Sequence, residues 1–127
     1  MKNTGAYPRV RVDTARVAAV GQAGGVLFTE TVRATGLDLA LSDALSSWRK
    51  PFATHDPGKI VADLAIALAL GGDALADIGA LRGEPGVFGL VASDPTVSRL
   101  ITALAADPVR AITAINTARQ AARARAW

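Results

Sequence analysis

The fold is decided by the stretch Asp56-Pro57-Gly58-Lys59-Ile60-Val61-Ala62-Asp63-Leu64-Ala65-Ile66-Ala67-Leu68-Ala69-Leu70-Gly71-Gly72. An acid followed by proline is a common helix start, because the carboxylate caps free backbone N–H groups and proline suits the first helical position. Apolar side chains then cover nearly every face, so the pattern predicts a central buried helix that ends at the glycine pair. Asp63 interrupts this apolar run, and a buried carboxylate needs a partner. We expect Arg82 or Arg99 to be that partner, unless Asp63 lies at an exposed edge.

Further helices are expected on both sides of this stretch, because apolar residues recur there at spacings of three and four. The expected helices cover 26–36, 37–48, 73–83, 93–104 and 107–127. Gly36 is the expected C-cap of the first, and Asp73 and Asp94 are expected to cap later ones. Residues 84–92 are expected to form a loop with one helical turn around Val87 and Phe88.

The amino-terminal part has a different pattern. Residues 8–13 alternate strictly between apolar and polar side chains, which predicts a short half-buried strand. A second short strand is expected over 17–20, ended by the glycines at 21, 24 and 25. The expected fold is therefore mainly α, a compact helix-turn-helix-like bundle of about six helices with a short amino-terminal β element. It forms one domain over 1–127, with the β element in 1–22 and the helices in 23–127.

Composition excludes several kinds of site. The chain has no cysteine and one histidine, His55, so disulfides, thiolate sites and multi-histidine metal sites are excluded. No signal peptide is apparent, and the most apolar window is shorter than the roughly 18 residues of a membrane span. We expect a soluble, cytoplasmic protein with no membrane partner.

The charges are segregated along the chain. Residues 1–50 carry seven Lys or Arg against four Asp or Glu, and residues 51–107 carry three against seven. Residues 108–127 carry four arginines and no acid. Eleven of the fourteen basic residues are arginine, the type suited to phosphate and guanine contacts. Genomic base composition also favours arginine, but it does not explain the segregation.

One candidate DNA contact is the expected helix start at Ser93-Asp94-Pro95. It presents Thr96, Ser98 and Arg99 in the manner of a recognition helix, whose first turn faces bases and phosphates. The alternative is an ordinary capped surface helix. The loop before it is longer than the usual turn of a helix-turn-helix.

Other candidate contacts are arginines that share a face. Arg119 and Arg123 are four residues apart on the last expected helix, and Arg9 and Arg11 share one face of the first expected strand. Each pair is suited to contact phosphates without sequence preference. The alternative for both pairs is a solvated polar face.

Carboxylates and His55 do not indicate a catalytic centre. Asp73 and Asp77 share a helix face, but caps and solvated positions explain the acids better than metal ligands do. His55 has no evident base or nucleophile partner, and no phosphate-binding loop or nucleophile elbow occurs. We expect no catalytic residue and no metal ligand in this chain.

Several stretches together carry a family resemblance. The most specific is the ordered run Ser93-Asp94-Pro95-Thr96-Val97-Ser98-Arg99. The others are Ala23–Leu37, Trp48–Pro51, His55–Ile60, Leu70–Ile78, Leu81-Arg82, Glu84–Gly89 and Val91–Leu100. They resemble the start of actinobacterial insertion-sequence transposases of the thirteen-eighty group, over nearly the whole chain from Gly21 onward.

The resemblance implies a function for this region. Such transposases have a ribonuclease-H-like domain with an Asp-Asp-Glu triad and two divalent ions, Mg²⁺ in relatives, for phosphoryl transfer. The resemblance implies that the first catalytic aspartate follows an Asp-x-Asp strand, and no such strand appears before Trp127. The helical pattern still continues at Trp127, so we expect the chain to be cut off before the catalytic domain. We expect the chain to bind double-stranded DNA at terminal inverted repeats, with a homodimer as one expected assembly, and to have no cofactor and no catalysis of its own. The alternative is a helical dimerisation module that does not bind DNA.

Overall fold

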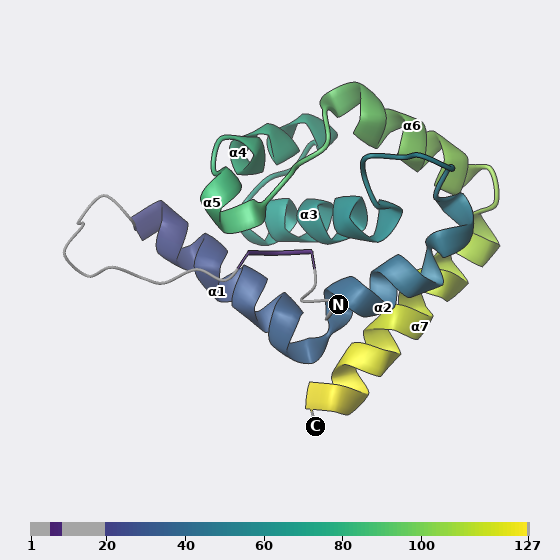
Figure 1. Ribbon diagram of the computed structural model, residues 1–127, viewed down its shortest axis with the longest axis horizontal. Coiled ribbons are helices and arrows are strands. Elements are labelled where there is room, and N and C mark those ends of the chain that lie inside the picture. The colour runs from purple at the N-terminus through teal and green to yellow at the C-terminus, as the bar shows by residue number, and fades with distance from the viewer. Residues whose placement is uncertain (1–5, 9–19, 127) are drawn as a thin grey trace.

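The computed structural model describes residues 6–8 and 20–126, and the elements of this part are helical (Figure 1). The α-helices are α1 (Val20–Thr35), α2 (Leu37–Ala44), α3 (Pro57–Ala69), α4 (Gly79–Arg82), α5 (Pro85–Phe88), α6 (Asp94–Ala105) and α7 (Pro108–Ala126). Two 3₁₀ helices, η1 (Ser46–Trp48) and η2 (Leu75–Ile78), complete them. The mainly helical prediction is confirmed. No described helix is long and apolar enough to cross a membrane.

Helix α3 is buried over much of its length, as its sequence predicts, but Leu68 near its end is 61% exposed. Asp56 is its N-cap, and the Asp56 carboxylate accepts a hydrogen bond of 3.0 Å from the Gly58 amide. Helix α2 packs most extensively against α3 on one side and α7 on the other (Figure 1). The side chains of Leu45, Ile78, Leu81 and Val97 are almost completely buried and belong to one core cluster.

Residues 6–8 form a short segment that connects elements distant in the sequence. The Ala6 amide donates a 2.9 Å hydrogen bond to the Asp38 carboxylate on α2. The buried Tyr7 hydroxyl donates to Asp63 on α3 at 2.6 Å. Figure 1 shows this segment running between α1 and α3. It therefore forms part of the core and holds α2 and α3 in place.

Some boundaries differ from the prediction. Helix α1 begins at Val20 and passes through Gly21, Gly24 and Gly25, so these glycines do not end a strand as expected. Gly25 fits there because it packs against the ring of Phe88, where a Cβ would come within 2.7 Å of Cζ. Residues 9–19, with most of both expected strands, lie outside the described residues.

The end of α2 and the cap before η2 also differ from the prediction, because local hydrogen bonds form there. The helix expected over 37–48 is interrupted, since α2 ends at Ala44 and a 3₁₀ turn follows. Asp73 is not the cap of the next helix: the Asp77 carboxylate accepts from the Asp73 and Ala74 amides at 2.8 and 2.9 Å. These backbone hydrogen bonds hold the pKa of Asp77 below its usual value.

The predicted end of α1 is confirmed. Gly36 has φ 72°, a left-handed conformation that favours glycine, and it separates α1 from α2. The expected turn of helix around Val87 and Phe88 is also observed, as α5. Helices α6 and α7 are joined by the short turn Ala106-Asp107, while a longer segment separates α5 from α6. A helix-turn-helix geometry remains a prediction.

The contact of α3 with α2 gives a stability test. A Cβ on Gly58 would lie 2.3 Å from the Ser42 backbone nitrogen, and backbone cannot move aside as a flexible side chain does. We expect Gly58→Ala to lower the free energy of unfolding by about 3 kcal/mol, as overpacking does in other cores. Urea unfolding measures this change.

Gly86→Ala is the matched control, because nothing lies within 4 Å of its Cβ position. It should change the free energy of unfolding by less than about 1 kcal/mol. Equal urea midpoints for the two variants would contradict the close packing of α3 on α2.

Candidate nucleic-acid interface

The first turn of α6 brings three of the predicted contact residues together. The Ser93 and Thr96 hydroxyls are hydrogen-bonded at 3.0 Å, and Arg99 Nη2 donates to the Thr96 hydroxyl at 3.1 Å. Ser93 and Arg99 are exposed and Thr96 is half-buried, so the three form a polar ridge along α6. Ser98 is also exposed, but it lies about 100° around the helix axis from Arg99 and is therefore off this ridge.

The helix start beneath this ridge carries its own carboxylate. Ser93, not Asp94, is the N-cap residue of α6, and Asp94 is the first helical residue. The expected capping role of Asp94 is therefore wrong. Instead, the Asp94 carboxylate forms a 2.8 Å ion pair with Arg82, which also donates to the Ala92 carbonyl at 2.8 Å. With Asp94 neutralised by Arg82, Arg99 is the cation that the ridge presents to solvent.

Helix α7 presents most of its arginines to solvent. Its buried residues are Ala111, Ala118 and Ala122, and these small side chains allow α7 to lie close against α2. Arg119 and Arg123 are exposed and line a shallow groove of about 270 Å³ with Thr31 and Thr35 of α1. Arg119 donates a 3.0 Å hydrogen bond to Asn116. The predicted pair therefore lies on one accessible surface.

The two predicted surfaces are not adjacent. Figure 1 shows the start of α6 at the top of the molecule and the end of α7 at the bottom. The ridge of α6 and the arginines of α7 therefore belong to separate regions of the surface. Arg9 and Arg11 lie outside the described residues.

The partner of Asp63 differs from both expected candidates. Arg82 pairs with Asp94, and Arg99 bonds to Thr96. Asp63 has no exposed area, and its carboxylate accepts from Lys59 Nζ at 2.5 Å and from the Tyr7 hydroxyl at 2.6 Å. The Lys59 ammonium also lies 4.5 Å from the centroid of the Tyr7 ring and donates to the Leu90 carbonyl at 3.3 Å. We call Tyr7, Lys59 and Asp63 the buried network.

Burial dominates the electrostatics of the buried network. Loss of solvation raises the pKa of Asp63, although the Lys59 ammonium and the Tyr7 hydroxyl act to lower it. Loss of solvation also lowers the pKa of Lys59, while the Asp63 carboxylate raises it. The Tyr7 pKa is raised by burial and then by the Asp63 charge, so the hydroxyl stays protonated and donates. Lys59 and Asp63 titrate as a pair, because each one sets the charge that the other meets.

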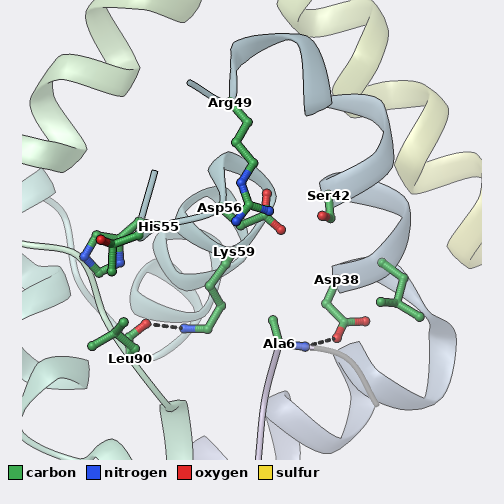
Figure 2. Close-up of a pocket in the computed structure, with 10 residues that line it drawn as sticks. Ala6, Asp38, Ser42, Arg49, His55, Asp56, Lys59 and Leu90 are labelled. Carbon is green, nitrogen blue, oxygen red and sulfur yellow. Dashed lines mark hydrogen bonds between the residues drawn. The ribbon is translucent and has the colours of Figure 1, made fainter. Parts of the chain in front are cut away.

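A pocket of about 310 Å³ lies beside the buried network (Figure 2). Its lining includes two cations, Arg49 and Lys59, and two carboxylates, Asp38 and Asp56. The half-buried His55 also lines it, and His55 belongs to no group of three metal-ligating side chains within residues 6–8 and 20–126. Because cations and carboxylates line it together, the pocket does not favour a polyanion. No pattern in the sequence singled out Asp38 or Arg49, since the pocket joins α2, the loop before α3 and residue 6.

Comparison with known proteins identifies the family. Residues 2–125 match the protein family described as "Transposase DDE domain group 1". The chain belongs to this transposase family. No curated protein and no solved structure matches it.

A DDE transposase is expected to hold divalent ions on three acidic residues, and the described acids of this transposase chain do not fit such a centre. No three Asp, Glu, His or Cys side chains gather within residues 6–8 and 20–126 to hold a metal ion. The Asp63 carboxylate is already bound to Lys59 and Tyr7, and the buried Asp38 carboxylate accepts a hydrogen bond from the Ala6 amide. We therefore derive no metal-dependent step from these residues.

The buried network gives a pH-dependent stability prediction. Lys59→Met leaves the Asp63 carboxylate buried without its cation, and we expect a loss of about 3–5 kcal/mol at about pH 7. Without Lys59, the folded-state pKa of Asp63 is raised further above its unfolded value. The stabilisation from protonated Asp63 is then present at low pH and lost as the pH rises through the folded-state pKa. The deficit should therefore shrink between about pH 7 and about pH 5, as urea unfolding at both values would show.

Lys59→Met/Asp63→Asn is the control, because it removes both charges and keeps an acceptor for Tyr7. Most of the lost stability should return, and the deficit should no longer depend on pH. A single variant that is as stable as the wild type at about pH 7 would show that the pair is not required.

Proposed function

We propose that this chain is a DNA-binding region of an insertion-sequence transposase and that it recognises the terminal inverted repeats. We further propose that it belongs to the actinobacterial transposases of the thirteen-eighty group. It would act in the cytoplasm on double-stranded DNA. The proposal assigns no cofactor and no catalytic step to residues 1–127. Membership of a transposase family supports a role on DNA.

The charge distribution on α7 is the observation that carries the proposal. This helix of 19 residues contains four arginines and no acid, and its buried contacts are made by alanines. Arg119 and Arg123 are exposed one turn apart, and neither forms an ion pair with another described residue. Two accessible guanidinium groups at this spacing suit successive phosphates, whose neutralisation releases counterions.

The ridge of α6 is the proposed source of sequence preference. Arg99 carries the guanidinium there, and Thr96 orients it through the 3.1 Å hydrogen bond. A guanidinium held in this way suits a bidentate contact to guanine, whereas Ser93 and Ser98 hydroxyls suit phosphate or base edges. The separation of the two surfaces is consistent with one duplex contacting them at different places along its length, or with two duplexes.

Helical dimerisation is the second candidate function. Val109 and Ile112 are three residues apart on one side of α7 and are 77% and 59% exposed. Apolar side chains at this spacing suit a helix–helix contact with a second copy. A stable dimer that binds no duplex in sedimentation and titration experiments would favour this candidate.

Fluorescence anisotropy over a range of salt concentrations tests the DNA proposal. We expect tighter binding to the inverted-repeat duplex of the element than to a shuffled duplex, with affinity falling steeply as salt rises. Arg123→Gln should weaken binding to both duplexes and reduce the salt slope by about one. Arg99→Ala should instead cost about 1–3 kcal/mol on the inverted repeat and little on the shuffled duplex.

Arg33→Gln is the charge-matched control for Arg123→Gln. It removes the same charge from α1, but Arg33 is already paired with Glu30. The salt slope should therefore stay unchanged. Equal affinity for both duplexes with little salt dependence would refute the proposed function.

A further inference from the structure

Phe52 has a backbone conformation and an exposure that the fold does not explain. It lies between η1 and α3, and its side chain is fully exposed at 105%. Its φ is 62°, the one positive value at a non-glycine residue in the described part of the chain. The Ala53 amide donates to the Lys50 carbonyl at 3.1 Å, so Lys50-Pro51-Phe52-Ala53 is a β-turn. With proline at its second position it matches a type II turn, whose third position favours glycine.

This arrangement costs stability and gives none back through packing. A left-handed conformation at an aromatic residue is strained, and an exposed ring buries no apolar area. Strained residues of this kind occur mostly at ligand-binding sites, where the strain is balanced by function. The ring is nevertheless placed well for contact, because the turn holds it away from the protein.

Cations lie at the base of this turn. Lys50 is exposed beside Phe52, and the segment 44–55 contains Arg49 and Lys50 but no acid. From α7, Arg110 stacks over the ring of Trp48 with its guanidinium carbon 4.1 Å from the centroid, and it also bonds to the Ser47 hydroxyl. Asp107 is the acidic neighbour of Arg110, at the 4.0 Å limit of an ion pair. An exposed aromatic ring next to the exposed Lys50, with Arg110 held against the residues that precede the turn, is complementary to stacked bases between phosphates.

We infer that Phe52 inserts between neighbouring base pairs of bound DNA, while Lys50 and Arg110 hold the flanking phosphates. This inference rests on the proposed function and adds a contact outside both surfaces considered above. Apolar wedges of this kind unstack one base step and kink the duplex, and stacking on an aromatic ring tolerates any sequence. An apolar protein partner fits less well at Phe52, because the exposed Lys50 adjoins this ring, whereas the exposed apolar pair Val109 and Ile112 lies on α7.

Local unstacking gives a direct readout. We would use inverted-repeat duplexes that carry one 2-aminopurine, whose fluorescence rises when it loses its stacked neighbours, at successive positions. We expect the wild-type chain to raise the fluorescence several-fold at one step, and Phe52→Ala to abolish the rise and weaken binding about tenfold. Phe52→Trp should keep the rise, because indole also stacks. Leu68→Ala is the matched control, since it removes another exposed apolar side chain.

Phe52→Gly separates this role from a structural one. Glycine adopts a positive φ freely, so this variant should unfold at a higher urea concentration and yet lose the fluorescence rise. If it unfolds earlier than the wild type, Phe52 supports the fold and the inference fails. If the wild-type chain binds DNA with the expected salt slope but Phe52→Ala leaves the fluorescence unchanged, the wedge is refuted while the proposed function stands. If the wild-type chain does not bind the duplex, both are overturned.

Discussion

The carboxylate of Asp63 is buried in the most apolar helix of the chain, and it must be neutralised for the core to close. Lys59, one turn earlier on α3, supplies the cation, and Tyr7 supplies a hydroxyl from a segment 56 residues away in the sequence. An uncompensated charge in this position would cost several kcal/mol. The position of residues 6–8 beside α3 is therefore coupled to the electrostatics of the core and not only to apolar packing.

This arrangement divides the charges of the molecule into two groups. Inside the molecule, Lys59 forms an ion pair with Asp63, and the Asp38 carboxylate accepts a hydrogen bond from the Ala6 amide. Outside, α7 is fixed against α2 by alanines, which leaves the guanidinium groups of Arg119 and Arg123 available to solvent. The inner charges specify how the helices fit together, and the outer charges determine which partner the surface attracts. The chain belongs to a transposase family, and DNA is the partner that we propose for these exposed arginines.

The pairing of ions shows where sequence reasoning failed. Arg82 and Arg99 were the plausible partners of Asp63 by residue type, but Arg82 is held by Asp94 and Arg99 by Thr96. Lys59 was closer in sequence, at a spacing that places two side chains on the same helix face. Its role was hidden because an i,i+4 pair usually lies on a solvated surface, whereas here both members are buried. The ridge of α6 was easier to predict, because Ser93, Thr96 and Arg99 are neighbours on one helix.

The sequence by itself determined the local features of this protein: the helical class, the starts of α3, α6 and α7 at their proline-containing caps, the left-handed glycine after α1, and the segregation of charge. These depend on hydrogen bonds and torsion angles within a few residues, so neighbouring sequence is enough to define them. The tertiary structure alone decided the partner of Asp63, the closeness of Gly58 to α2, the separation of the two arginine-bearing surfaces, and the exposure of Phe52. Lys59 lies only four residues before Asp63, but the burial of this pair and the other features depend on how segments far apart in the chain pack together, which a local pattern cannot specify.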